Sequence, residues 1–296
     1  INFVSKFKKA NIISITIFVL SIIFIIFKGL NYGIDFKGGT LIELRTETSV
    51  NPSIIRDTLN SMNLGDINVK KFGKDGDFLI KVEQKGDNSK LIPEIKKSLS
   101  DNLNSDINFR RVENVGPKVS SELLQSGIIA ISLSLAAMLF YIWVRFEWQF
   151  SIGSIIALFH DVIITLGIFS LLSLEINLSI IAAVLTIVGY SMNDTVVIYD
   201  RIRENLGKFH KLNISDIANL SINETLARTI ITSVTTLLAL FSIFILGGEI
   251  LRGFSFAMIL GVLIGTYSSI FVASPILKFF KVSYKTLEKE EEKIVP

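Results

Sequence analysis

The sequence predicts an α-helical membrane protein of six transmembrane helices, with an α+β domain inserted after the first helix. Two properties of the whole chain favour this class: half of its 296 residues are hydrophobic, and only 19% are charged. The third observation is local, because one long polar stretch separates the first of several long apolar segments from the rest. Soluble domains of this length carry more charge, so we expect the chain to lie in a bilayer.

Each long apolar segment can cross a membrane as a helix. A bilayer core about 30 Å thick needs about 20 apolar helical residues. The segments that meet this requirement are residues 10–27, 126–144, 150–172, 178–199, 226–246 and 254–279. The first is too long for a removable signal peptide and lacks its small-residue cleavage site, so we expect a permanent anchor.

Outside the large loop, most lysines and arginines near the ends of the predicted helices lie on one side. Six alternating helices bring the following residues to the same side: Lys6, Lys8, Lys9, Arg145, Arg201, Arg203, Lys208, Lys211, Lys278, Lys281, Lys285, Lys289 and Lys293. The opposite short loops hold only Glu175, Glu249 and Arg252. Positive loops stay in the cytoplasm, so both termini are predicted to be cytoplasmic and the large loop extracytoplasmic.

The large polar loop is predicted to be a folded domain. Its alternating and helical patterns and its turn residues follow the order strand 40–46, helix from Asn51 and Pro52, strand 68–72, turn 73–77, strand 78–83, helix 90–103 and strand 107–112. This β-α-β-β-α-β order is the ferredoxin-like pattern, which hosts many functions and so identifies none. Gly33, Gly38 and Gly39 predict a tight turn before the first strand.

The predicted organisation has four parts. Residues 1–28 form the cytoplasmic N-terminus and first transmembrane helix, and residues 29–124 form the extracytoplasmic domain. Residues 125–280 form a five-helix transmembrane core. Residues 281–296 form a charged cytoplasmic tail.

The residue inventory excludes several classes of function. There is no cysteine, so no disulfide and no thiolate metal site is possible, and two histidines do not make a His-rich metal cluster. A net charge of +3 is too small to indicate nucleic acid. No phosphate-binding loop, nucleophile elbow or zinc-protease motif occurs, so we expect no enzyme, no cofactor and no use of ATP. The proton gradient is then the obvious energy source.

One acid lies inside the fourth apolar segment. Asp194 is a functional candidate by default, because an unpaired carboxylate in hydrocarbon is costly. Three- and four-residue steps place Thr186, Tyr190, Asn193 and Asp194 on one face of a helix, and Arg228, Thr232 and Thr235 on one face of the next.

Two antiparallel helices can oppose these faces, which makes an Asp194–Arg228 pair possible. Protonation of Asp194 would release Arg228, giving a switch with two packings. The alternative is structural: Arg228 extends to the headgroups and Asp194 holds helices together. Asp194→Asn separates the two, because asparagine keeps the shape and cannot ionise.

Three weaker motifs lie elsewhere. His160 and Asp161 in the third segment either extend a proton path or satisfy their neighbours locally. Gly261 and Gly265 form a G-x-x-x-G pattern that permits close helix packing. Gly116 and Pro117, before the second segment, indicate a helix start or a hinge.

Five stretches together resemble one family. NYGIDFKGGT, VENVGPKVS, ALFHDV, VGYSMNDTVVIYDRIREN and ETLARTIITSVTTLLAL occur in the order found in the SecF subunits of the bacterial protein translocase. These belong to the SecD/SecF family and are similar to the resistance-nodulation-division superfamily. The resemblance covers essentially the whole chain, and the stretch around Asp194 is its most specific part.

The resemblance implies a subunit of the inner (plasma) membrane that, with SecD, uses the proton-motive force to assist late stages of protein export. Asp194 matches the family's membrane acid and Arg228 its arginine, with Tyr190, Asn193 and Thr232 in support. The implied partners are SecD as a separate chain, the SecYEG translocon, YajC-like subunits, the translocating preprotein and the lipid bilayer, with no nucleic acid. Two alternatives stay open: a proton-driven small-molecule exporter, and a passive assembly subunit.

Overall fold

The computed structural model describes residues 1–47, 50–62, 64–71, 74–83, 91–103, 107–284 and 286. The chain forms two compact units. The helical unit contains residues 1–31, 130–174 and 179–296, and the α/β unit contains residues 32–129 and 175–178. Parts of four predicted elements lie outside the described residues: the last residue of the strand 68–72, the start of the turn 73–77, the first residue of the helix 90–103, and most of the C-terminal tail.

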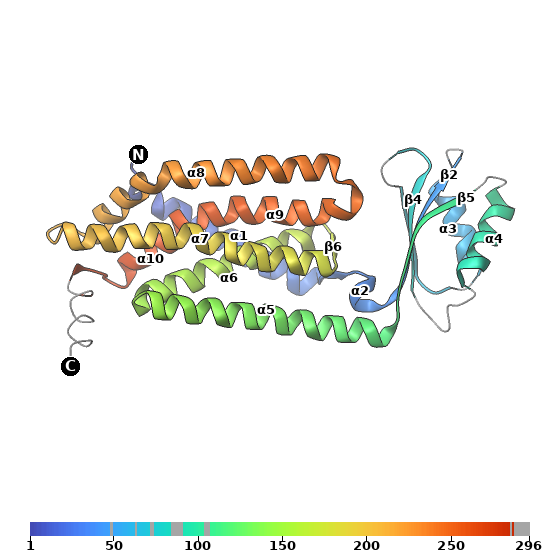
Figure 1. Cartoon of the computed structure of the whole chain (residues 1–296), viewed down its shortest axis with the longest axis horizontal. Coiled ribbons are helices and arrows are strands. Elements are labelled where there is room, and N and C mark those ends of the chain that lie inside the picture. The colour runs from blue at the N-terminus through green and yellow to red at the C-terminus, as the bar shows by residue number, and fades with distance from the viewer. Residues whose placement is uncertain are drawn as a thin grey trace. The chain divides into compact units, whose positions relative to one another are not determined.

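Six helices in the described part of the chain are long and apolar enough to cross a membrane, as predicted. They lie side by side in Figure 1. The first five are α1 (Val4–Lys28), α5 (Pro117–Arg145), α6 (Trp148–Leu171), α7 (Leu178–Lys208) and α8 (Ile214–Leu246). The sixth consists of α9 (Gly248–Ser268), a π-helical turn η1 (Ser269–Ala273) and α10 (Ser274–Phe279).

Several of these helices are longer than their apolar segments. The helix α7 continues through a charged stretch to Lys208, and α8 begins at Ile214, well before the apolar residues start. Asn213 explains the early start of α8, because its side chain accepts a hydrogen bond from the backbone N–H of Asp216 and caps the helix. Hydropathy marks only the part of a helix that lies in hydrocarbon, so it underestimates such helices.

Three of the six helices form the interior of the helical unit. In α6, α7 and the α9–α10 segment, half or more of the most apolar window is buried, against 11–17% in α1, α5 and α8. Gly261 and Gly265 let α9 approach α7 closely. A Cβ atom at Gly261 would lie 2.2 Å from Ile187, and one at Gly265 would lie 2.9 Å from Ser191. The G-x-x-x-G prediction of close packing is therefore confirmed for this pair of helices.

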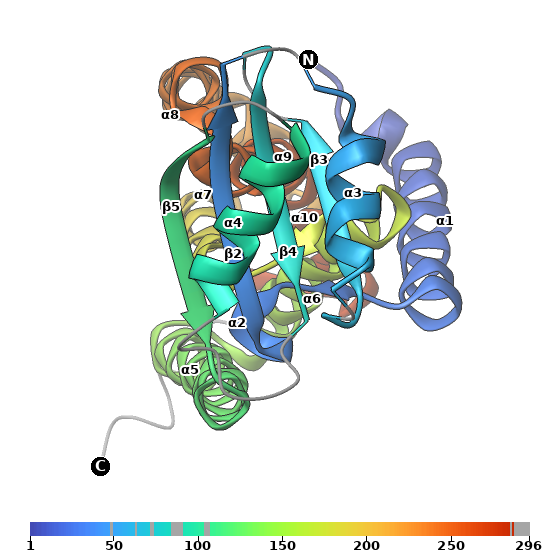
Figure 2. The same ribbon diagram turned by 90° about the vertical axis from the view of Figure 1, so that its right-hand side faces the viewer.

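The α/β unit contains a four-stranded antiparallel sheet of order β3-β4-β2-β5. The strands are β2 (Gly39–Thr46), β3 (Ile67–Lys71), β4 (Asp77–Val82) and β5 (Ile107–Val115). The helices α3 (Pro52–Asn60) and α4 (Leu91–Leu103) cover one face of the sheet (Figure 2). Their apolar faces and the sheet enclose a core of fully buried side chains: Ile42, Leu44, Ile55, Leu59, Phe78, Ile80, Ile95 and Leu99.

The predicted turn before the first long strand contains a short helix, α2 (Ile34–Lys37). This helix ends at Gly38, whose φ of +78° lies in the left-handed region that favours glycine. Gly39 has a φ of +134°, and a Cβ atom there would lie 2.7 Å from the backbone oxygen of Val82. The glycine pair therefore permits both the chain reversal and the close strand contact.

Two short strands were not predicted. They are β1 (Asn31–Tyr32) and β6 (Glu175–Ile176), which pair with each other. The segment 175–178 lies between α6 and α7 in sequence but belongs to the α/β unit. There the N–H of Gly33 donates to the oxygen of Ile176, and the N–H of Leu178 donates to Asp35 Oδ2 at 2.9 Å. Two-residue strands carry no periodic signal, which explains why the sequence did not reveal them.

Candidate functional site

Asp194 lies near the middle of α7 and is only 3% exposed. The hydroxyl of Thr266 on α9 interacts with its carboxyl group, and Arg228 on α8 attracts it electrostatically. Its Oδ2 atom has no hydrogen-bond partner within the described residues. The unpartnered oxygen of this buried carboxyl group can bind a proton or accept a further hydrogen bond.

Arg228 and Asp194 are neighbours without a direct ion pair in the described part of the chain. Arg228 is exposed on the outside of the helical unit, whereas Asp194 points inward. The structure thus brings the predicted acid and base within electrostatic range and leaves the arginine accessible from outside.

A chain of hydroxyl groups links the surroundings of Asp194 to the neighbouring helices. Ser233 Oγ on α8 lies 2.7 Å from Thr266 Oγ1, and Tyr190 Oη on α7 donates to Ser233 at 3.5 Å. Three helices, α7, α8 and α9, therefore contribute polar atoms beside one acid. Tyr190 was predicted as a supporting residue, whereas Ser233 and Thr266 were missed.

The four residues predicted to share one polar face of α7 differ in their burial. Asp194 is buried, while Thr186 and Asn193 are exposed and Tyr190 is half buried. Successive residues on a helix point about 100° apart, so a helix that buries Asp194 can expose its neighbour Asn193, as it does here. Asn193 therefore belongs to the outer surface.

Thr232 lies one turn after Arg228, on the side of α8 where Arg228 and Thr235 are exposed. Its hydroxyl donates to the backbone oxygens of Arg228 and Thr229 on its own helix. Thr235 is exposed and donates in the same way to Ile231 and Thr232. These hydroxyls satisfy the helix backbone, as threonine commonly does within apolar helices.

A second buried acid, Asp161, lies on α6 and is fully buried. Its Oδ1 atom is 2.9 Å from Nδ1 of His160. Its Oδ2 atom accepts hydrogen bonds from Ser191 on α7 at 2.5 Å and from Ser268 on α9 at 2.8 Å. The structure therefore places the two predicted residues in contact and adds two serine donors that the sequence did not indicate.

The charged residues that flank the helices pair with one another at one end of the unit. Arg145 donates to Asp200 at 2.7 Å, and Arg203 donates to buried Glu147 at 2.8 Å. Arg201 bonds Glu224 at 2.7 Å and so joins α7 to α8. Among the described residues, no group of three or more histidine, aspartate or glutamate side chains is arranged to hold a metal ion.

Two family models match this chain. Residues 95–283 match the family described as "Protein export membrane protein SecD/SecF, C-terminal". Residues 23–50 match the SecD/SecF GG motif, which includes the glycine pair Gly38 and Gly39. Together the two matches include both buried acids and the turn that leads into the sheet.

Curated relatives and solved structures agree with the family models. The protein translocase subunit SecF of Rickettsia rickettsii is 46% identical over 290 residues, which cover 96% of this chain and 94% of the relative. The SecF subunit of Rickettsia bellii is 47% identical over 278 residues, with 93% and 92% covered. The crystal structure of SecDF from Thermus thermophilus, described as a translocon-associated membrane protein, has a TM-score of 0.86 and 37% identity.

This chain is shorter than the solved relatives. The match covers 95% of this chain but only 38% of the Thermus thermophilus SecDF chain. A second crystal structure, of SecDF in a super-membrane-facing form, has a TM-score of 0.70 and 36% identity, with 99% and 40% covered. The curated relatives, by contrast, match over nearly their full length.

Proposed function

Because the chain belongs to the SecD/SecF family of protein-export membrane proteins, we propose that it is an accessory subunit of the Sec machinery. Together with SecD, it uses the proton-motive force to assist late stages of protein translocation across the inner membrane. The printed names of its relatives, SecF and SecDF, support the export role. The proton-driven part rests on the chain's own residues.

The observation that carries the proton-driven part is the burial of Asp194 inside an apolar helix, with one carboxyl oxygen unpartnered. Acids at such positions mark proton pathways in membrane proteins. One charge that crosses 100 mV releases about 2.3 kcal/mol, enough to bias two packings that differ by a few kcal/mol.

In the proposed cycle Asp194 binds and releases the proton. When it is ionised, it attracts Arg228 and accepts from Thr266, which favours one arrangement of α7, α8 and α9. Protonation removes the attraction, so Arg228 turns to other partners and the helices repack. Tyr190, Ser233 and Thr266 supply the hydroxyls that can lead water or a proton toward the acid.

The α/β unit is the part that acts on the exported chain. We infer a ferredoxin-like domain of residues 29–124, followed by a five-helix core of 125–280 and a tail of 281–296. The antiparallel sheet order β3-β4-β2-β5 with two helices on one face supports this type of domain. With both termini cytoplasmic, the domain lies in the periplasm, and Arg145, Arg201 and Arg203 lie at the cytoplasmic end of their helices.

SecD is the principal proposed partner. Polar groups on the outer surface of a membrane bundle are costly in lipid, and Thr186, Asn193 and Arg228 are exposed there. A second helical bundle that covers this surface would satisfy them. The SecYEG translocon, YajC-like subunits and the translocating preprotein complete the proposed assembly in the lipid bilayer.

Asp194→Asn tests this function in vesicles that contain the SecD partner and the translocon. We expect the variant to assemble normally and to lose the stimulation of translocation by a proton gradient. Asp200→Asn is the matched control, because Asp200 is on the same helix but pairs with Arg145 at the surface. Stimulation that persists in Asp194→Asn would show that the chain is a passive assembly subunit.

A further inference from the structure

Asp161 is a second acid in the interior of the helical unit, and the cycle described above does not use it. All of its oxygens are hydrogen-bonded, to His160, Ser191 and Ser268. Each of the three inner helices contributes to this cluster: α6 carries the acid and histidine, α7 carries Ser191, and α9 carries Ser268. The carboxyl group therefore joins the three inner helices at one point.

The hydrogen bonds define the proton positions in the cluster. Both serine hydroxyls donate to Oδ2, so Oδ1 remains for His160. With Asp161 ionised, the ring proton of a neutral His160 lies on Nδ1 and faces Oδ1, which leaves Nε2 with a free lone pair. His160 is 6% exposed, and its Nε2 atom has no hydrogen-bond partner among the described residues.

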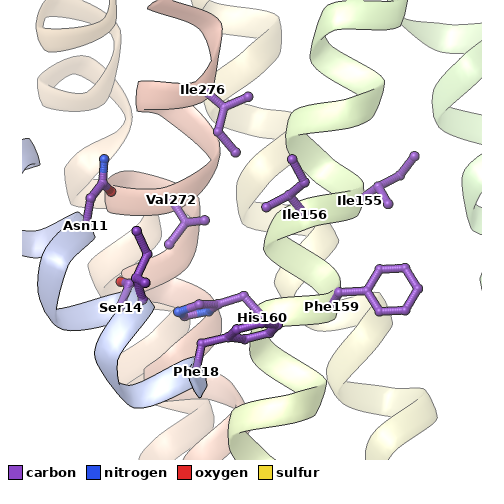
Figure 3. Close-up of a pocket in the computed structure, with 10 residues that line it drawn as sticks. Asn11, Ser14, Phe18, Ile155, Ile156, Phe159, His160, Val272 and Ile276 are labelled. Atoms are coloured by element: carbon purple, nitrogen blue, oxygen red, sulfur yellow. The ribbon is translucent and has the colours of Figure 1, made fainter. Parts of the chain in front are cut away.

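A pocket of about 450 Å³ is lined in part by the side chain of His160. Residues of α1, α6, η1 and α10 line it, and its polar lining groups are Asn11, Ser14 and His160. In Figure 3 the ring of His160 points toward Ser14 on α1. Phe18 stacks against the same ring, with 6.3 Å between centroids and 2° between planes, and so fixes its orientation. The pocket is large enough to hold water.

The two acids use neighbouring residues of the same two helices. On α7, Ser191 bonds Asp161 and lies three residues before Asp194. On α9, Ser268 bonds Asp161 and lies two residues after Thr266, which interacts with Asp194. We therefore expect a change in the α7–α9 contact at one acid to alter the hydrogen bonds of the other acid.

The helix α9 changes geometry at this point. It passes into the π-helical turn η1 directly after Ser268, and Ser269 in this turn lies 2.9 Å from Thr195 on α7. Single π-helical turns inside α-helices occur frequently at functional sites. Ser268, a donor to Asp161, thus lies directly before the change from α-helix to π-helix.

We propose that Asp161 is a second proton-binding acid. It is protonated and deprotonated through His160, which exchanges the proton with the pocket. This inference rests on the proposed proton-driven function. A hydronium ion in the pocket gives a proton to Nε2, and the ring passes its Nδ1 proton to Oδ1 of Asp161. The products are a neutral carboxylic acid, an imidazole protonated on Nε2, and water. The reverse transfer returns the proton.

The neutral acid accepts hydrogen bonds from Ser191 and Ser268 less strongly than the carboxylate does. Protonation therefore loosens the junction of α6, α7 and α9. Among the described residues, His160 is the one titratable side chain in contact with Asp161. The packed helices contribute Phe18 and Ser14 from α1, Ser191 from α7 and Ser268 from α9.

Nitrogen-15 NMR of histidine tests the proton transfer directly in the full-length chain in lipid. The chain has two histidines, and His210→Gln leaves only the signals of His160. In the alkaline form we expect the ring proton on Nδ1, facing Asp161, and acidification should place a proton on Nε2. Asp161→Asn should change the Nδ1 signal. A ring that carries its proton on Nε2 in both the alkaline and the acid sample would overturn the proposal.

A translocation assay with the SecD partner tests the consequence for function. We expect Asp161→Asn and His160→Gln to lower proton-driven translocation by roughly tenfold or more. Ser268→Ala should shift the pH of half-maximal activity. His210→Gln is the matched control, because His210 is exposed and should behave as the wild type.

The outcomes separate this inference from the proposed function. If Asp194→Asn abolishes the stimulation while Asp161→Asn and His160→Gln keep the wild-type rate and pH profile, the second site is wrong and the proposed function stands. If Asp194→Asn keeps the stimulation, the proposed function fails. If Asp161→Asn does not accumulate in the membrane, the His160→Gln variant and the NMR measurement decide whether the second site exists.

Discussion

Thr232 and Ser233 are adjacent on α8, yet their hydroxyl groups serve different helices. Thr232 donates to its own backbone, whereas Ser233 contacts Thr266 on α9 and receives a hydrogen bond from Tyr190 on α7. A step of 100° between adjacent residues makes this difference. The function of a polar residue in an apolar helix thus depends on its direction as much as on its depth.

This pair gives a prediction at the level of single residues. Ser233→Ala should lower proton-stimulated translocation by about fivefold, because one lost hydrogen bond corresponds to about 1 kcal/mol. Thr232→Ala removes a bond within α8 and should have a smaller effect. Translocation rates at equal membrane levels of both variants check the difference, and equal rates would mean that the Ser233–Thr266 contact is dispensable.

Helix α9 combines close packing with a local change of winding. Its glycines allow α7 to approach within a distance that any Cβ atom would prevent, and its π-helical turn follows Ser268 immediately. One donor to each acid comes from this short part of the helix: Ser268 for Asp161 and Thr266 for Asp194. Small residues are therefore needed here to position the serine and threonine hydroxyls.

Gly265→Ala tests this packing. Its Cβ would lie 2.9 Å from Cβ and 3.2 Å from Cα of Ser191, so the helices must separate. Overpacking of this kind costs about 1–3 kcal/mol, and we expect a lower midpoint of thermal unfolding in detergent. Gly253→Ala in the same helix is the control, because its nearest neighbour would be Ile180 at an ordinary 3.5 Å. Similar midpoints for the two variants would contradict the argument.

At the scale of the whole molecule, the α/β unit contains an ion pair of its own between Arg45 and Asp77. Asp77 is buried at the start of β4 and accepts two hydrogen bonds of 2.5 Å from Arg45 on β2. The hydrogen bonds from Arg45 hold the pKa of Asp77 below its usual range, and the nearby charge of Arg110 lowers it further. A lowered pKa in the folded state means that this stabilisation is complete above the unfolded aspartate pKa. It is lost as the pH falls through the lowered folded value.

We therefore expect protection of β2 and β4 against hydrogen exchange to decline in acid. In the full chain, acid incubation followed by labelling at one fixed pH would reveal the decline. Asp77→Asn should reduce protection at neutral pH and remove this contribution to the acid dependence. Protection that varies with pH identically in both proteins would show that another group controls it.

Hydropathy alone predicted the six membrane helices. Alternating apolar residues predicted the four long strands of the α/β unit, and apolar residues at helical spacing predicted its two longer helices. The depth of Asp194 within an apolar run also followed from the sequence. The hydroxyl partners did not, because Ser191, Ser233 and Ser268 are ordinary residues until the tertiary packing brings them to an acid. The sequence also did not show that Asn193 is exposed while its neighbour Asp194 is buried, because polar residues at three- and four-residue steps spread over a wide arc of the helix.

The short segment 175–178 connects α6 to α7 and is built into the α/β unit. The helices that carry Asp161 and Asp194 therefore share one covalent link, and that link is itself part of the other unit. If the helices slide in the proposed cycle, the chain connection alone would transmit a pull to Gly33 and Asp35 through their bonds to Ile176 and Leu178.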